Sequence, residues 1–483
     1  MKLKLFNPFL IIKVLSTILL IECAAFLLCL PVSYIYDEPG TPFYLSAGIC
    51  FMLSLVFSLI SQRTGKSRFS NRDAYLVVAF AWVLFLVMAT LPYIFSGIIP
   101  SFIDAFFETS SGFTTTGSTV ISDLTPVPKS ILFWRSLTHW IGGLGIIALV
   151  IIILPSLKVT GYQLFTLESS LREKIHPRTK AIGFRILFIY LGLTVAQVIF
   201  LSLGEMDIFE SICHTFATVA TGGFGLKNDS LISYSSYSQY VIMVFMFLAG
   251  ISQVVYYYLF KFNFHKIRHN EELWFYIVVT VVAGTLLSSI LFVNSSATPE
   301  YAIRSGFFNA VSLITTTGFV SADYLFWPAP AIMVLFLLFF AGASTGSTTG
   351  SIKMARHIIV IKSIKAALVK LIHPSAVQNV RFNDKIVSEK TCISIISFVV
   401  LYLFIFLIGT ILIVITGSDV VTAASATAAS LGNIGPGMGL AGPLYNYAHF
   451  PEAAKIIFSV LMILGRVEII AILTLFTGSF WKL

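Results

Sequence analysis

Four short segments rich in threonine and glycine interrupt an otherwise apolar chain, and their backbone carbonyls are the groups that could do chemistry. Glycine allows a positive φ, so successive carbonyl oxygens can point the same way. Carbonyl oxygens aimed at one axis can replace the water shell of a dehydrated alkali cation. We therefore predict that the four segments together form one cation site. They are Thr115-Thr116-Gly117-Ser118, Thr221-Gly222-Gly223-Phe224, Thr316-Thr317-Gly318-Phe319 and Asn433-Ile434-Gly435-Pro436.

A second kind of glycine-rich segment, 341–351, falls halfway along an apolar run and is otherwise mostly Ser and Thr. Such a composition does not favour a straight helix in lipid. We predict a broken helix whose middle forms a gate below the cation site. The alternative is a small-residue packing face. A nucleotide P-loop is excluded, because no Gly-Lys-Ser/Thr follows the glycines. The predicted gate residues are Gly346, Ser347, Thr348, Thr349 and Gly350.

Arg466 lies deep in the last apolar run, where a charged side chain is costly and indicates a function. Glu468 is two residues further on, so it sits on another helix face and is a poor local partner. Facing a pore, Arg466 would repel cations or anchor the gate segment. The alternative is a structural ion pair with an acid on a neighbouring helix. Arg135, Arg185 and Arg304 lie near the ends of apolar runs, where we expect them to snorkel.

The composition requires a membrane around these segments. Of the 483 residues, 57% are hydrophobic and 11% are charged, and the mean hydropathy is +0.91. The long continuous apolar runs predict an all-α polytopic membrane protein. The scattered cysteines and histidines show no metal-ligand spacing, and no nucleophile–base pair is visible, so we predict no enzyme.

The net charge of +9 does not indicate nucleic acid, because the basic residues concentrate in alternate connectors. Positive charge marks the cytoplasmic side. We therefore predict that both termini are cytoplasmic and that the acid-rich, Thr/Gly-bearing connectors face outward. Contact of the basic connectors with anionic lipid headgroups is also expected.

The chain is organised as two leading helices followed by a pattern that occurs four times. About ten spans are predicted, each long enough to cross the bilayer. They are roughly 9–32, 40–62, 74–98, 131–155, 183–204, 237–261, 273–293, 328–352, 391–416 and 452–480. The predicted domains are 1–66 for the two leading helices, then the repeats 73–156, 181–262, 272–352 (with the gate) and 390–481.

A short amphipathic run precedes each Thr/Gly segment and predicts a half-helix that enters the membrane and returns as an extended strand. Its negative C-terminal dipole end would favour a cation, and Asp104, Asp207 and Asp419 at the outer rim would concentrate cations. The four runs are SFIDAFFETSSGF, DIFESICHTFATV, YAIRSGFFNAVSLI and DVVTAASATAASL.

Thr221-Gly222-Gly223-Phe224-Gly225 resembles the Thr-Val-Gly-Tyr-Gly filter of potassium channels, and the other three segments are degenerate versions of it. With two leading helices and four unequal repeats, the chain from residue 8 to its end resembles the TrkH/TrkG membrane subunits of the bacterial Trk potassium uptake system, relatives of KtrB and plant HKT transporters. The resemblance implies a pseudo-fourfold, potassium-channel-like pore. It also implies a homodimer, a cytosolic nucleotide-binding TrkA ring as regulator, and a place in the bacterial inner membrane.

The same resemblance implies a function for the Thr/Gly segments. They would be a potassium selectivity filter with K⁺ as the bound ion and no covalent cofactor, and Arg466 would join the gate. In plant relatives, serine at the first filter glycine accompanies sodium preference, so glycine at all four positions implies potassium. The fourth segment departs from the pattern at Asn433, Ile434 and Pro436, which predicts an asymmetric filter. The alternative function is a secondary symporter coupled to H⁺ or Na⁺; intramembrane carboxylates other than Glu468 are few in the sequence, which favours the channel-like mode.

Overall fold

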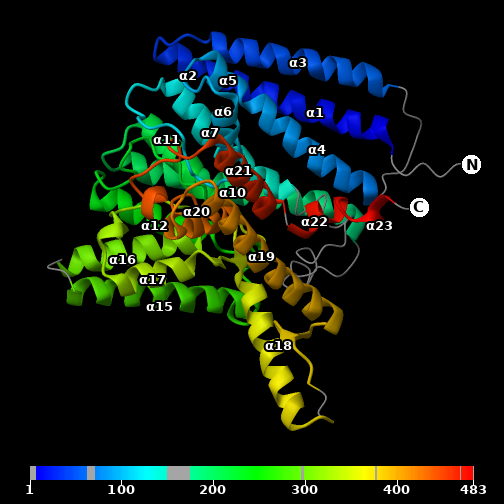
Figure 1. Cartoon of the computed structure of the whole chain (residues 1–483), viewed down its shortest axis with the longest axis vertical. Coiled ribbons are helices and arrows are strands. Elements are labelled where there is room, and N and C mark those ends of the chain that lie inside the picture. The colour runs from blue at the N-terminus through cyan, green and yellow to red at the C-terminus, as the bar shows by residue number, and fades with distance from the viewer. Residues whose placement is uncertain are drawn as a thin grey trace, which may run out of the picture.

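The computed structural model describes residues 7–62, 71–148, 175–294, 298–375, 378–467 and 469–481. This part of the chain is helical apart from turns, loops and two pairs of two-residue strands (Figure 1). An all-α membrane fold was the sequence prediction, and it is confirmed.

The two leading helices lie side by side along one edge of the molecule (Figure 1). They are α1 (Pro8–Leu27) and α3 (Thr41–Ser61), with the short α2 (Leu30–Ile35) between them. Hydroxyls join them inside the apolar interface: Ser16 Oγ lies 3.0 Å from Ser54 Oγ, and each hydroxyl also donates to the other helix's backbone carbonyl.

The remaining elements are described in four groups along the chain. The first group is α4 (Asn71–Ala89), α5 (Leu91–Phe95), α6 (Phe102–Phe113) and α7 (Lys129–Ala148). The second is α10 (Ile175–Ser202), α11 (Ile208–Val219), α12 (Ser236–Ala249), α13 (Gln253–Phe260) and α14 (Phe264–Arg268). The third is α15 (Glu271–Asn294), α16 (Pro299–Ile314), η2 (Tyr324–Phe326), α17 (Ala329–Leu338), the parallel pair β1 (Ala341–Gly342) and β2 (Ile352–Lys353), and α18 (Met354–Ile372). The fourth is the antiparallel pair β3 (Arg381–Phe382) and β4 (Lys385–Ile386), α19 (Glu389–Ile415), α20 (Val420–Gly432), η3 (Gly439–Ala441), α21 (Glu452–Arg466), α22 (Ile469–Leu475) and α23 (Gly478–Trp481).

Five helical segments of the described chain are long and apolar enough to cross a membrane, or six if α12 and α13 form one bent span. The predicted span 237–261 is not one straight helix, because α12 and α13 meet at 92°. Gly250, at the bend, packs so closely against Tyr276, Thr315 and Ala343 that a Cβ would collide with them. The predicted span 452–480 is also interrupted, since α21 ends at Arg466.

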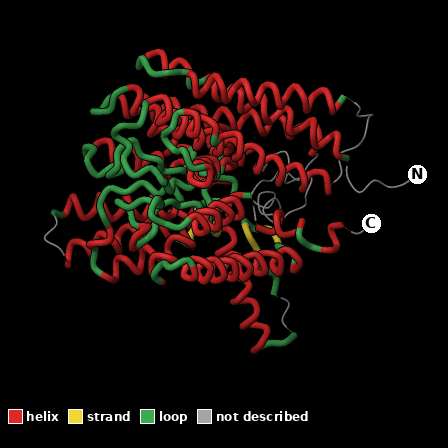
Figure 2. Tube along the Cα trace, turned by 45° about the horizontal axis from the view of Figure 1, so that its top comes forward, coloured by secondary structure: helices red, strands yellow, loops and turns green. Residues whose placement is uncertain are grey.

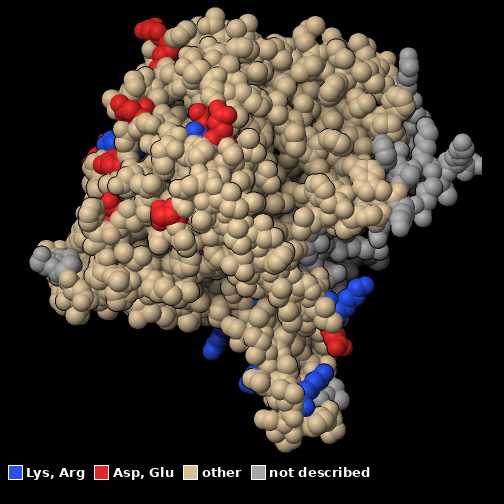
Figure 3. Space-filling view, viewed as in Figure 1, with Lys and Arg blue, Asp and Glu red and all other residues tan. Residues whose placement is uncertain are grey.

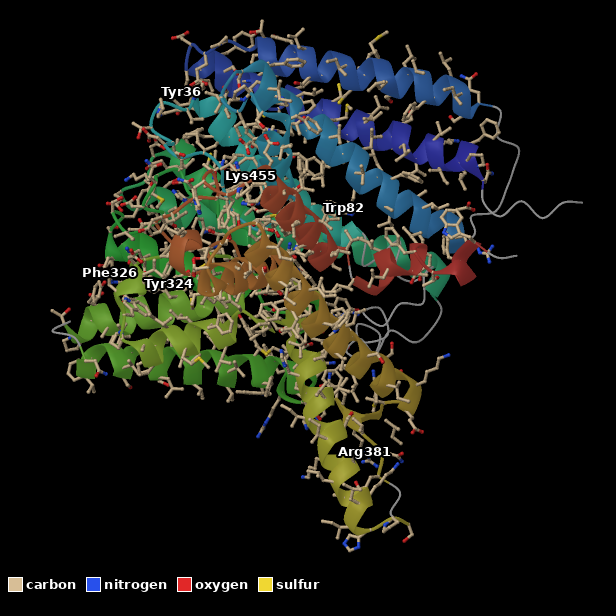
Figure 4. The ribbon with its side chains drawn as sticks, in the orientation of Figure 1. Tyr36, Trp82, Tyr324, Phe326, Arg381 and Lys455 are labelled. Atoms are coloured by element: carbon tan, nitrogen blue, oxygen red, sulfur yellow. The ribbon has the colours of Figure 1, made fainter. Side chains whose placement is uncertain are left out.

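Charge is distributed unequally over the surface. Acidic side chains gather around the loops at one side, whereas basic side chains dominate the projection formed by α18 and the β3–β4 hairpin (Figure 3). Arg381 lies on this projection (Figure 4). The loops converge beside the packed helices rather than spreading over the surface (Figure 2), and these loops carry the Thr/Gly segments.

Candidate functional site

Four short helices of 12 to 16 residues precede the Thr/Gly segments, as the sequence predicted. Each begins at a residue whose side-chain oxygen accepts a hydrogen bond from the first turn, and this satisfies a backbone donor that the helix cannot. At α11, for example, Asp207 Oδ1 accepts from the Glu210 N–H at 2.6 Å. The capping residues are Ser101, Asp207, Thr298 and Asp419.

All four helices end in the same backbone motif. The first residue of each Thr/Gly segment is left-handed: φ is 53° at Thr115, 57° at Thr221, 52° at Thr316 and 55° at Asn433. The N–H of the following residue then bonds the carbonyl five residues earlier, at 2.7–2.9 Å, which is the Schellman pattern. These following residues are Thr116, Gly222, Thr317 and Ile434.

Positive φ is costly for threonine and tolerated better by asparagine. Three strained threonines at equivalent positions indicate a functional constraint on the backbone. Asn433, which departs from threonine in sequence, therefore fits the same conformation. The asymmetry expected of the fourth segment is absent from the backbone at this residue.

The glycines of the four segments close a ring. Each has φ between 77° and 105°, and a Cβ on it would overlap a carbonyl oxygen of the next segment. The overlapping pairs are Gly117 with Gly222 O, Gly223 with Thr317 O, Gly318 with Ile434 O, and Gly435 with Thr116 O. The order first, second, third, fourth and back to first places all four segments around one axis.

A polar cavity of about 90 Å³ borders this ring, and the four ring glycines, Gly117, Gly223, Gly318 and Gly435, line it. The fourth segment differs here in its carbonyl. Gly435 O accepts the hydroxyls of Ser118 at 2.9 Å and Tyr447 at 3.1 Å, so it has less capacity for a cation. The asymmetry of the fourth segment therefore lies in this carbonyl.

The predicted gate segment is not helical. It runs from β1 to β2, and Gly346 within it has a φ of 81°. Two left-handed threonines of the Thr/Gly segments touch it directly: the Gly350 N–H donates to Thr316 Oγ1 at 2.7 Å, and the Thr221 hydroxyl donates to Thr348 Oγ1 at 3.2 Å. Ser347 Oγ and Thr349 Oγ1 lie 2.9 Å apart within the segment.

Arg466 is 3% exposed and contacts the gate segment. Its Nη1 donates to Thr348 O at 2.5 Å, and its Nη2 donates to Gly142 O on α7 at 3.3 Å. Within the described part of the chain its hydrogen-bond acceptors are carbonyls, and it forms no ion pair. Glu468 lies outside the described residues.

Glu272, at the start of α15, is a buried group that the sequence analysis missed. It is 0% exposed. Its Oε1 accepts from the Thr345 N–H at 2.7 Å, the Thr345 hydroxyl at 3.0 Å and the Ala355 N–H at 2.9 Å. One carboxylate thus holds the gate segment near both of its ends. The sequence feature that could have identified Glu272 is an acidic residue at the start of an apolar run, directly after a basic connector.

The expectation that Arg135 snorkels is wrong. It is 2% exposed, and its Nε lies 2.6 Å from Oε1 of the equally buried Glu108. Snorkelling is unnecessary because the opposite charge is within reach inside the protein. The two residues are 27 positions apart, on α6 and α7, so local spacing gave no signal of the pair.

The three rim carboxylates have partners within the protein. Asp104 pairs with Lys455 on α21 at 2.7 Å; Figure 4 shows where Lys455 lies. Asp207 and Asp419 cap their own helices. Each of these carboxylates therefore has a structural role within the protein.

Apolar helices long enough to cross a bilayer, together with four short helices that lead into a ring of loops, are typical of a membrane transport protein. The family model described as "Cation transport protein", TrkH, matches residues 44–483. The chain belongs to the TrkH family.

Known proteins match this chain in sequence and in structure over most of its length. The Trk system potassium uptake protein TrkH of Escherichia coli K12 is 33% identical over 428 residues, which is 87% of this chain and 88% of that protein. The Trk system potassium uptake protein TrkI of Halomonas elongata is 31% identical over 479 residues, with 98% and 96% covered. The crystal structure of the potassium transporter TrkH from Vibrio parahaemolyticus matches with a TM-score of 0.89 at 29% identity and covers 98% of this chain and 99% of that one.

Proposed function

We propose that this protein takes up potassium across the cytoplasmic membrane through a channel-like pore. Its filter consists of the four Thr/Gly segments, whose carbonyls replace the water of K⁺. The gate is the segment Gly346–Gly350 together with Arg466, which holds Thr348 by its carbonyl. No covalent cofactor is needed. The relatives' names describe transport, so we assign transport rather than catalysis.

The observation that carries this proposal is the ring of glycine–carbonyl contacts. Segments more than 300 residues apart in the chain, Gly435 and Thr116, meet there at backbone distance. Each contact sets a backbone carbonyl against the glycine of the next segment, so four carbonyl-bearing segments surround one axis. Carbonyl oxygens around one axis are the groups that replace the water shell of a dehydrated cation. Such an arrangement is therefore best explained as a cation site.

The test is potassium and sodium flux into liposomes containing the purified protein, down imposed gradients and with or without a protonophore. We expect passive flux that prefers K⁺ and persists with the protonophore. Gly223→Ser should abolish the preference, because a Cβ there meets Thr317 O and serine tolerates its φ of 82° poorly. Gly478→Ser is the control, since a Cβ at Gly478 meets nothing within 4 Å.

The second candidate is a symporter that couples K⁺ to H⁺ or Na⁺. Buried carboxylates favour it, and the described helices contain more of them than the sequence analysis expected. Glu272 touches the gate segment, and Glu22 on α1 is 0% exposed with no hydrogen-bond partner for either oxygen. Flux that stops when the proton or sodium gradient is removed would support this candidate over the channel.

We further propose the assembly and orientation that the family implies. Both termini would be cytoplasmic in a bacterial inner membrane, with the repeats 73–156, 181–262, 272–352 and 390–481 around the pore. The acidic loops and the basic α18 projection support this orientation (Figure 3). The protein would form a homodimer and bind a TrkA-type ring.

The α18 projection is the proposed docking face for this ring, because the gate segment leads directly into α18. Lys362 there already pairs with Glu271, which leaves Lys365 and Lys370 as candidate contacts. Unchanged ring binding after Lys365→Gln and Lys370→Gln would count against this docking face.

A further inference from the structure

The seams between neighbouring filter segments are built from different chemistry. Neutral groups join the second segment to the third, where the Leu231 N–H donates to Val320 O at 3.1 Å. They also join the third to the fourth, where the Tyr324 hydroxyl donates to Gly437 O at 2.8 Å. The fourth meets the first through Ser118 and Gly435. The loops of the first and second segments also share a neutral hydrogen bond, from the Leu124 N–H to Asn228 Oδ1 at 2.8 Å, but these two segments are joined in addition by the Glu108–Arg135 ion pair.

Each member of this pair holds a different filter segment. Glu108 accepts from the Thr119 hydroxyl at 3.0 Å and from the Val120 N–H at 2.9 Å, so it holds the strand that follows Gly117. Arg135 donates to Gly225 O at 3.0 Å, and its guanidinium lies 3.8 Å from the centre of the Phe224 ring. The pair therefore reaches from the first segment into the second.

Corresponding positions in the other repeats carry no carboxylate. Nine residues before the filter glycine stand Glu108, His214, Asn309 and Ala426. Asn309 does the same task without charge, since its Nδ2 donates to Ser321 Oγ at 3.2 Å on the returning strand of its own repeat. Holding the strand thus needs a hydrogen bond and not a charge, so the ion pair calls for a further explanation.

Its position supplies that explanation. Arg135 lines the same cavity as the four filter glycines, so its charge borders the proposed ion path. With Glu108 at 2.6 Å the two charges nearly cancel at the cavity. If one partner is removed, an uncompensated buried charge of known sign remains beside the filter.

We propose that the charge balance of the Glu108–Arg135 pair sets how strongly and how selectively the filter binds cations. The inference rests on the proposed filter function and names two residues that tune it. Glu108→Gln leaves a positive charge that repels cations. Arg135→Gln leaves a negative charge that attracts cations of either kind, so affinity rises while discrimination falls.

The test measures the K⁺ concentration that gives half-maximal uptake into liposomes, together with the K⁺/Na⁺ flux ratio. Glu108→Gln should raise the half-maximal concentration about tenfold, and Arg135→Gln should lower it several-fold and reduce the ratio. The double variant should return the half-maximal concentration toward wild type. Glu300→Gln, which breaks an ion pair of half-exposed Glu300 with Arg304 on α16, is the matched control and should change neither quantity.

The decisive result is that the half-maximal K⁺ concentration shifts in opposite directions in Glu108→Gln and Arg135→Gln. A general loosening of the filter would instead shift it in the same direction in both single variants. The inference would be overturned if both single variants shifted the half-maximal K⁺ concentration in one direction. It would also be overturned if that concentration lay further from wild type in the double variant than in either single variant. If Glu108→Gln does not fold, Arg135→Gln and the double variant still test the inference, because the double variant should reverse the shift that Arg135→Gln causes. A wild-type protein without K⁺ preference would instead overturn the proposed function.

Discussion

At the scale of single residues, Arg466 illustrates how a buried charge can be satisfied by backbone. Its guanidinium donates to the carbonyls of Thr348 and Gly142, which joins the gate segment to α7. Hydrogen bonds from a charged donor contribute more than neutral ones. Loss of them should release the gate segment.

Arg466→Gln should therefore increase passive K⁺ flux by about tenfold, because the gate loses both an anchor and a repelling positive charge. The measurement is flux into liposomes without the regulatory ring. Lys455→Gln is the control, since it removes another buried cation from the same helix, α21, but near its N-terminal end, where Lys455 pairs with Asp104. If both variants raise flux equally, the effect belongs to α21 as a whole and not to the gate contact.

Asp419 offers a test outside the membrane-spanning helices. Hydrogen bonds from the Thr422 side chain and backbone hold the pKa of this exposed carboxyl below its usual value. A depressed folded-state pKa means that the stabilisation is present above the unfolded pKa of about 3.9 and is lost as the pH falls through the folded value.

Asp419→Ala should lower the stability of α20 by about 1 kcal/mol at pH 7, and the deficit should shrink as the pH falls below about 4. Thermal unfolding in detergent at several pH values measures it. Asparagine also caps helices, so Asp419→Asn should lose little stability at pH 7. A deficit of Asp419→Ala that stays constant with pH would show that the carboxylate's charge does not contribute.

At the scale of elements, the sequence predicted those helices and loops whose conformation is determined by neighbouring residues in the chain. The four half-helices were predictable, because capping residues and amphipathic spacing are local signals. The non-helical gate segment was predictable from its glycines and hydroxyls. The close packing of Gly250 at the bend was not, because its neighbours Tyr276 and Ala343 are remote in sequence. The contact of Arg135 with Glu108 was hidden for the same reason.

Glu272 connects the gate segment to α15, and its geometry separates hydrogen bonding from charge. All three donors bond to one oxygen, Oε1. A glutamine can keep that acceptor, whereas an alanine cannot. Glu272→Gln therefore distinguishes a residue that only holds the gate segment by hydrogen bonds from one whose charge couples K⁺ transport to another ion.

Glu272→Ala should raise passive flux about tenfold by freeing the gate segment near Thr345 and Ala355, while Glu272→Gln should stay within about twofold of wild type. Flux with and without a proton gradient is the measurement. A Glu272→Gln variant that fails as badly as Glu272→Ala would show that the carboxylate's charge is needed, and the symporter would become the better account.

At the scale of the whole molecule, the proposed filter is assembled from segments that end at residues 118, 224, 319 and 436, so an ion bound there would link four separate parts of the fold. A ligand that binds the folded state alone stabilises it according to its concentration relative to Kd, by about 2.7 kcal/mol at a hundredfold excess. Potassium should therefore raise the apparent unfolding temperature of the purified protein by about a few degrees, and sodium at the same ionic strength should raise it less. In Gly223→Ser, potassium and sodium should raise the unfolding temperature equally, because the new Cβ displaces the Thr317 carbonyl from the ring. Equal shifts with both ions would mean that the ring binds cations without selecting potassium, and no shift with either would mean that the ring is a packing feature and that the ion path lies elsewhere.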